Sequence, residues 1–211
     1  MAFCETGETH MEDDVMLNPV VHYTDLDRYQ LEVDVLFRKF PIIVGHATQL
    51  NGPGTYLTHD DTGIPILVTR NRAGEVKAFA NVCRHRGARV VNEACGKANT
   101  FACPYHSWTY DLDGALRGVP QPAGFPELDK SSRGLLELPA FERFGLIWVR
   151  PEACEDEIDI DAWLAPMAEQ LQSLDLAAHV IYREWSIATD MSWRLALEGF
   201  QESYHFCSAH K

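Results

Sequence analysis

Apolar residues near the start of the chain recur at the spacing of a helix. The run begins after Thr24, and Pro41 ends it because the residue before a proline is disfavoured in helical conformation. Thr24 and Asp27 stand three residues apart, which is the spacing of a capping box. We therefore expect a helix up to residue 40, after a poorly patterned tail over residues 1–20. Its apolar positions are Leu26, Tyr29, Val33, Leu36, Phe37 and Phe40.

From residue 42 to 149 the pattern changes to short apolar runs separated by turn residues. Glycine-containing breaks at 51–54, 72–74 and 113–114 have the chemistry of tight turns or hairpins. Many short strands at close spacing predict an all-β sandwich or a small barrel. The expected strands are 42–46, 55–58, 66–70, 76–81, 100–102, 108–111, 135–138 and 146–149.

After Pro151 the sequence becomes acidic, and residues 152–163 are expected to include a solvated linker. A helix is predicted over 160–174, interrupted at Pro166. A strand is predicted over 179–189, with Trp185 and Ile187 facing inward.

The last predicted element is an amphipathic helix from Trp193 onward. Without the context of the rest of the chain, its pattern indicates an apolar face and a solvent-exposed acidic face that carries Glu198, Glu202 and His205. We divide the chain into a tail and helix (1–40), a β domain (41–151), and a linker with a further partial domain (152–211).

Charge and composition narrow the classes of partner. The chain has 46% apolar residues and a formal net charge of −13, with 31 acidic against 18 basic residues. Such a surface repels phosphate backbones and anionic lipid, so no nucleic-acid or membrane partner is expected. The sequence has no eighteen-residue apolar run, and its acidic start lacks the features of a signal peptide. We therefore expect a cytoplasmic protein.

Two mixed pairs of metal-binding residues carry the candidate chemistry. Cys83 and His85 form one pair, Cys103 and His106 the other, and 17 residues separate the pairs. Each pair follows an expected strand, so both are predicted at loop tips at one end of the β domain. Two Cys and two His can hold one zinc or a [2Fe–2S] cluster. The mixed pairs favour the cluster, since like ligands on one iron then come from different loops. Cys4, Cys95, Cys154 and Cys207 are expected to be unligated thiols.

The residues around these pairs resemble the motif of the Rieske non-haem iron, or ring-hydroxylating, oxygenases. The pattern C-x-H-R-G followed by C-P-Y-H-x-W is present, and it departs from the family at Ser107, where Gly is common. The resemblance implies a Rieske cluster held by Cys83, His85, Cys103 and His106. It also implies an α+β chain: an all-β Rieske domain, an N-terminal helix and the start of a helix-grip-like catalytic domain. The other matching positions are Arg86, Gly87, Pro104, Tyr105 and Trp108.

The last twenty residues resemble the mononuclear iron motif of the same oxygenases. That resemblance implies that His205 and His210 are the two His ligands of Fe(II), and that Glu202 bridges to a Rieske histidine of a neighbouring subunit. Gly199 stands where many relatives have Asn. The family's third ligand is an Asp farther downstream, whereas the sequence given ends at Lys211, so we expect an incomplete catalytic domain.

The activity implied by the resemblance is oxygenation. An α subunit of this family receives electrons from a reductase or ferredoxin and passes them to Fe(II), which activates O₂ to hydroxylate or demethylate a small organic, typically aromatic, substrate. A homotrimer or an α/β hetero-oligomer is expected for the full-length form. Two other readings remain open from the sequence: a stand-alone Rieske electron carrier, and a zinc-stabilised binding protein.

Overall fold

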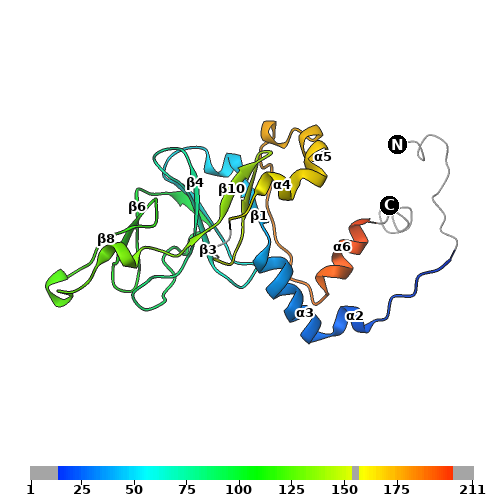
Figure 1. Ribbon diagram of the computed structural model, residues 1–211, viewed down its shortest axis with the longest axis horizontal. Coiled ribbons are helices and arrows are strands. Elements are labelled where there is room, and N and C mark those ends of the chain that lie inside the picture. The colour runs from blue at the N-terminus through cyan, green and yellow to red at the C-terminus, as the bar shows by residue number, and fades with distance from the viewer. Residues whose placement is uncertain (1–13, 154–156, 202–211) are drawn as a thin grey trace. The chain divides into compact units, whose positions relative to one another are not determined.

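The computed structural model describes residues 14–153 and 157–201, and the chain divides into two compact units (Figure 1). One unit is Glu32–Ser186. The other combines the described residues up to Leu31 with those from Ile187 onward. Each unit is described below by itself.

The larger unit is built on a five-stranded antiparallel sheet with the order β5-β2-β3-β4-β9 (Figure 1). Register is regular through the centre, where Val68 of β3 faces Ala78 of β4. β3 is buried along nearly its whole length, which matches its continuous run of apolar and β-branched residues. The strands are β2 (Thr55–His59), β3 (Ile66–Arg70), β4 (Val76–Ala80), β5 (Cys95–Lys97) and β9 (Glu137–Leu138).

Two three-stranded antiparallel sheets flank it. One has the order β1-β11-β10, with β1 (Ile42–His46), β10 (Ala140–Arg143) and β11 (Leu146–Val149). The β10–β11 hairpin turns on Phe144 and Gly145, both with positive φ, as a two-residue hairpin of the type I′ class requires. The other sheet has the order β6-β7-β8, with β6 (Thr100–Ala102), β7 (Thr109–Asp111) and β8 (Leu116–Gly118).

Two apolar clusters fill the space between the sheets. The first surrounds Phe79 and Tyr110 and includes Cys83 and Cys103, so the candidate thiols belong to the core of the domain. The second surrounds Ile66 and Ile147. The predicted all-β domain is confirmed, and seven of its eight expected strands lie within one residue of the observed bounds at both ends.

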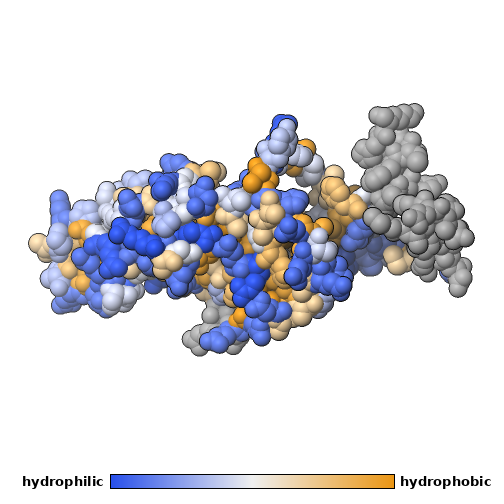
Figure 2. All heavy atoms as spheres, turned by 90° about the horizontal axis from the view of Figure 1, so that it is seen from above, coloured by the Kyte–Doolittle hydropathy of each residue, from blue (hydrophilic) through white to orange (hydrophobic). Residues whose placement is uncertain are grey.

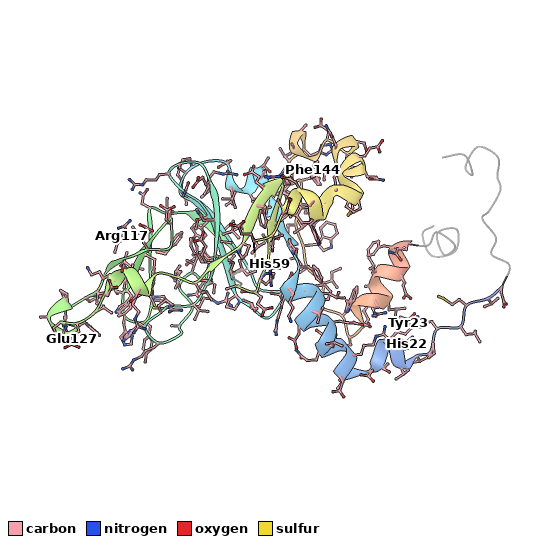
Figure 3. All side chains as sticks on the ribbon, in the orientation of Figure 1. His22, Tyr23, His59, Arg117, Glu127 and Phe144 are labelled. Atoms are coloured by element: carbon pink, nitrogen blue, oxygen red, sulfur yellow. The ribbon has the colours of Figure 1, made fainter. Side chains whose placement is uncertain are left out.

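A helical segment packs on β10 and β11 of the same unit. Asp159 caps its first helix by accepting hydrogen bonds from the backbone of residues 161 and 162. Trp163 meets Trp148 of β11 edge-on, and Phe144 lies in the turn beside the segment (Figure 3). The break predicted at Pro166 is present. The elements are α4 (Ile160–Leu164), a 3₁₀ turn (Ala165–Met167), α5 (Ala168–Ser173) and a 3₁₀ turn (Leu176–Ala178).

The predicted strand over 179–189 is wrong for this structure. These residues form no strand among the described elements, and Trp185 and Ile187 are 69% and 74% exposed rather than inward. A strand needs backbone hydrogen bonds from a neighbour, and none of the described strands pairs with this segment. Apolar and polar side chains do alternate along this segment, but alternation does not form a strand without a neighbouring strand to pair with.

The smaller unit contains α2 (Val21–Thr24), the first part of α3 (Leu26–Glu32) and α6 (Trp193–Gln201). The predicted N-terminal cap is corrected by one residue. Asp25 rather than Thr24 accepts the backbone N–H of Arg28 at 2.8 Å. Tyr23 of α2 donates to Glu198 of α6 at 2.7 Å (Figure 3).

Other differences concern the bounds of the first helix and short elements that were not predicted. The helix expected up to residue 40 is α3 followed by a π-helical turn (Val33–Phe37). β5, β8 and β10 had no clear apolar alternation and were not predicted. The remaining short elements are 3₁₀ turns at Ala47–Leu50, Pro122–Gly124 and Lys130–Arg133.

Within the described residues, no helix is long and apolar enough to cross a bilayer.

Candidate metal centre

The two candidate ligand loops share one backbone design. In the first, the C=O of Cys83 accepts from Gly87 at 2.9 Å, and its N–H donates to Ala88 at 2.8 Å. In the second, the C=O of Cys103 accepts from Ser107 at 2.8 Å, and its N–H donates to Trp108 at 2.8 Å. Each loop is therefore a closed turn that begins at its cysteine.

The residue that closes each turn has a left-handed backbone. Gly87 has φ 74° and Ser107 has φ 55°. Glycine adopts this conformation at no steric cost, whereas serine is strained there. The departure from the family motif at Ser107 thus keeps the geometry of the turn and adds strain to it.

The loops bring the two predicted thiols close to each other and the two predicted imidazoles close to each other. The Cys83 and Cys103 side chains lie in the core at 3% and 2% exposure, while His85 is half-buried and His106 is exposed. The two imidazole rings are 4.7 Å apart between centroids. Nδ1 of His85 is buried and has no hydrogen-bond partner. A buried ring nitrogen without a partner is costly unless it binds something, such as a metal.

Protonation of these groups follows from their surroundings. Burial, the largest cause, raises the pKa of the Cys103 thiol, and the Cys83 sulfur beside it adds to the rise; backbone N–H groups of Tyr105 and His106 act in the opposite direction. Desolvation, followed by the charges of His106 and Arg86, lowers the pKa of His85. His85 is thereby favoured in the neutral form that binds metals, whereas the thiols must lose a proton to do so.

Tyr110 contacts the first ligand loop through its hydroxyl group. It is fully buried, and its hydroxyl lies 3.3 Å from Sγ of Cys83. The backbone N–H of Arg84 donates to the same oxygen at 3.0 Å. Because that N–H occupies an acceptor position of the hydroxyl, the O–H proton is free to point at the sulfur. Desolvation is the main reason that the pKa of Tyr110 is strongly raised, so this proton is retained.

Asn81 fixes the return of the same loop. Its buried side chain donates to the C=O of Val91 at 2.8 Å and accepts from the N–H groups of Val90 and Val91 at 3.2 and 3.0 Å. Neither Asn81 nor Tyr110 was predicted from the sequence as a support of the site. A polar residue directly after the apolar run 76–80 was a usable signal for Asn81. Tyr110 had none, because an aromatic residue in a strand is ordinarily core.

Aromatic side chains surround both imidazoles. Trp108 stacks on His85 at 4.8 Å with the planes 8° apart, and Phe125 meets His85 edge-on at 6.2 Å. Tyr105 lies over His106 at 3.8 Å. Beside the two histidines is an open pocket of about 340 Å³, which Trp108 and Phe125 also line. Its other lining residues are Ser107, Pro120 and Gln121.

This donor set fits a [2Fe–2S] cluster. Two buried thiols from different loops and two adjacent imidazoles match the Cys₂His₂ ligation of a Rieske centre. Among the described residues, no three His, Cys, Asp or Glu side chains are grouped to hold a single metal ion. Cys83, Cys95 and Cys103 form no disulfide within the described residues. Cys95 is exposed, whereas Cys83 and Cys103 are buried.

Comparison with known proteins agrees with this geometry. The family model of the Rieske [2Fe–2S] domain matches residues 40–139. Residues 40–139 are a Rieske domain. The α subunit of chlorobenzene dioxygenase from Cupriavidus sp. is 36% identical over 191 residues, covering 87% of this chain and 42% of the relative. The oxygenase subunit of glycine betaine monooxygenase from Chromohalobacter salexigens is 34% identical over 197 residues, covering 91% and 42%.

Solved structures extend the similarity beyond the Rieske domain. The quaternary ammonium Rieske monooxygenase CntA superposes with a TM-score of 0.84 at 29% identity, covering 91% of this chain and 54% of that one. The naphthalene 1,2-dioxygenase from Rhodococcus sp. gives 0.65 at 27% identity, covering 70% and 34%. The chain is thus related to the N-terminal part of Rieske oxygenase α subunits, and it spans about two fifths of the length of the curated relatives.

The second predicted site lies outside the described residues. Glu202, His205 and His210 all follow the last described residue of α6, so their roles remain predictions.

Proposed function

We propose that this chain is the N-terminal part of the oxygenase component of a multicomponent Rieske non-haem iron oxygenase. The observation that carries the proposal is the convergence of two buried thiols and two imidazoles, one with an unpartnered Nδ1, on two loops of a Rieske domain. Both the aromatic-ring dioxygenases and the quaternary-amine monooxygenases among its relatives are oxygenases of this kind.

In this proposal, Cys83 and Cys103 hold one iron and His85 and His106 the other. A bound [2Fe–2S] cluster supplies one-electron reduction and reoxidation, at a potential that its neutral His ligands raise above that of all-Cys clusters. The half-buried and exposed imidazoles place the His side of the site at the protein surface, where an electron partner reaches it.

The surrounding side chains hold the site in one geometry. Tyr110 directs its hydroxyl proton at the Cys83 sulfur, where the hydrogen bond favours added negative charge. Asn81 fixes the first loop through three hydrogen bonds. Trp108 orients the His85 ring by stacking and keeps water from its buried face.

The remainder of the proposal rests on the family resemblance. His205 and His210 would hold a mononuclear Fe(II) together with a carboxylate, as the family resemblance implies, and Glu202 would connect the two metal sites across a subunit boundary. Substrate oxygenation would hydroxylate or demethylate a small organic molecule. The partners would be a reductase or ferredoxin, with a trimeric or α/β assembly in the cytoplasm.

The test separates an oxygenase from a stand-alone electron carrier. The protein, expressed with whatever follows Lys211 in its gene, is supplied with NADH and a ferredoxin–reductase pair, and O₂ uptake is measured with benzene and with glycine betaine. Uptake that depends on an organic substrate and is lost in His205→Ala supports the proposal. Reversible one-electron reduction without substrate-dependent O₂ uptake in either wild type or variant would indicate a carrier.

A further inference from the structure

A hydrogen bond joins α2 and α6 within the smaller unit, between residues 175 positions apart in the sequence. Tyr23 of α2 donates its O–H to Oε2 of Glu198 at 2.7 Å. Glu198 has no role in the iron site predicted from the sequence. The bond nevertheless connects the N-terminal segment, where Figure 3 labels His22 and Tyr23, to the helix that precedes the predicted iron ligands.

Three side chains form a series of hydrogen bonds that ends on Glu198. Nδ1 of His22 lies 2.6 Å from Oδ1 of Asn18, and because an amide oxygen only accepts, Nδ1 carries the proton. Nδ2 of Asn18 donates to the hydroxyl oxygen of Tyr23 at 2.5 Å, so the O–H proton is left for Glu198. Every donor in the series points towards Glu198, and bonds aligned in this way strengthen one another.

The proton of Tyr23 stays on its hydroxyl group. The hydrogen bond to Glu198 is the largest cause that raises the pKa of Tyr23, followed by desolvation and by the negative charge of Glu198. Asn18 and Arg194 act in the opposite direction without reversing the rise. Tyr23 is thus a neutral donor to an ionised carboxylate, and such a bond is stronger than one between two neutral groups.

Burial contributes little to the orientation of α6 in the described part of the chain. None of its described residues is buried, and Leu197 and Phe200 are 47% and 89% exposed. Figure 2 likewise shows hydrophobic atoms, coloured orange, on the visible surface of the molecule. A helix whose apolar face is uncovered gains little stability from packing, so a directional hydrogen bond has more influence on its rotation.

The rotation of α6 matters because of the residues that follow it. Glu198, Glu202 and His205 share one face of the helix predicted from the sequence. We propose that Tyr23 is a positioning residue for the iron site, because its bond to Glu198 fixes the direction of the face predicted to carry His205. The inference rests on the proposed function, and it gives the N-terminal residues 18–23 a part in the second metal site.

Removal of the Tyr23 hydroxyl tests the proposal in the protein expressed with whatever follows Lys211 in its gene. Tyr23→Phe should bind Fe(II) about threefold more weakly, as expected for the loss of one solvent-exposed hydrogen bond. Anaerobic equilibrium dialysis against Fe(II) measures this affinity as the iron taken up beyond that of the cluster. Amide hydrogen exchange of residues 193–201 should become about threefold faster in the same variant.

A double-mutant cycle assigns the effect to the bond itself. Glu198→Leu removes the acceptor, and it should weaken Fe(II) binding by the same factor of about three. Combining it with Tyr23→Phe should cause no further loss, since both changes remove one interaction. Glu198→Gln keeps an oxygen that can accept the O–H, so its affinity should stay within about twofold of wild type.

Tyr29→Phe is the matched control. Tyr29 is an exposed tyrosine of the same unit, and its hydroxyl forms no hydrogen bond with any residue in the ranges that the structure describes. Loss of this hydroxyl should change neither the affinity for Fe(II) nor the exchange of residues 193–201.

The outcomes are distinct. An unchanged Fe(II) affinity or an unchanged exchange of α6 in Tyr23→Phe would overturn the proposal. So would additive losses in the double variant, or a loss in Glu198→Gln as large as in Glu198→Leu, which would assign the effect to the charge of Glu198. Failure of the proposed function would appear separately, as wild-type protein that takes up no Fe(II) beyond its cluster although the exchange of α6 still responds to Tyr23→Phe.

Discussion

The hydrogen bond from Tyr110 to Cys83 should raise the reduction potential of the centre. Replacing Tyr110 by Phe removes only the hydroxyl, which lies 3.3 Å from Sγ and accepts the N–H of Arg84 at 3.0 Å. The added electron increases negative charge on the sulfur ligands, so a donor at this position favours the reduced form. The potential of Tyr110→Phe should therefore be lower than that of wild type.

The size of the shift follows from the strength of the bond. Hydrogen bonds to charged groups contribute about 1.5–3 kcal/mol, and a sulfur acceptor lies at the lower end. If about 1 kcal/mol of this distinguishes the reduced from the oxidised form, the shift is roughly 40 mV for one electron. A redox titration followed by the visible absorbance measures it directly.

Tyr56→Phe is the control for this titration. Tyr56 belongs to the same apolar cluster and packs edge-on against Phe101, but within the part of the chain that the structure describes its hydroxyl forms no hydrogen bond with a candidate ligand. Its removal should leave the potential unchanged. A potential within about 10 mV of wild type in Tyr110→Phe, with full iron content, would refute the assigned direction of the Tyr110 proton.

Three other predictions concern the ligand loops. His85→Cys should retain iron and lower the potential by at least about 100 mV, because thiolate adds negative charge; an unchanged potential in the redox titration would count against His85 as a ligand. Ser107→Gly should stabilise the domain in urea unfolding by about 0.5–1 kcal/mol by relieving left-handed strain, and destabilisation would contradict this. Asn81→Ala should cost roughly 2–4 kcal/mol in the same assay and speed iron loss to a chelator, because three buried hydrogen bonds are lost; a cost under about 0.5 kcal/mol would show that water replaces them.

Sequence patterning predicted the β domain well because its strands are local and strongly apolar. The bounds of β1, β3, β6 and β11 were predicted without error. Short exposed strands such as β5, which contains a glycine, carry no alternation and owe their structure to pairing with β2. The error over residues 179–189 is the opposite one: a strand was predicted from the alternation of side chains, but none of the described strands pairs with this segment.

The candidate site also has a part that the sequence predicts, its ligands, and a part that it does not predict, the residues that support them. Its ligands could be predicted because chemistry limits them to thiolate and imidazole at fixed spacing. Their supports could not, because Tyr110 acts from a strand 27 residues beyond Cys83 and Arg84 offers it only a backbone N–H. The strain at Ser107 and the stacking of Trp108 on His85 likewise appear only in three dimensions.

The central claim is that Cys83, His85, Cys103 and His106 hold one [2Fe–2S] cluster. Its most direct test is low-temperature EPR of dithionite-reduced protein, with iron and acid-labile sulfide determined on the same sample. The account predicts a rhombic signal with two irons and two sulfides per chain, absent in Cys103→Ala. A colourless, EPR-silent protein with one zinc per chain and no sulfide would contradict it.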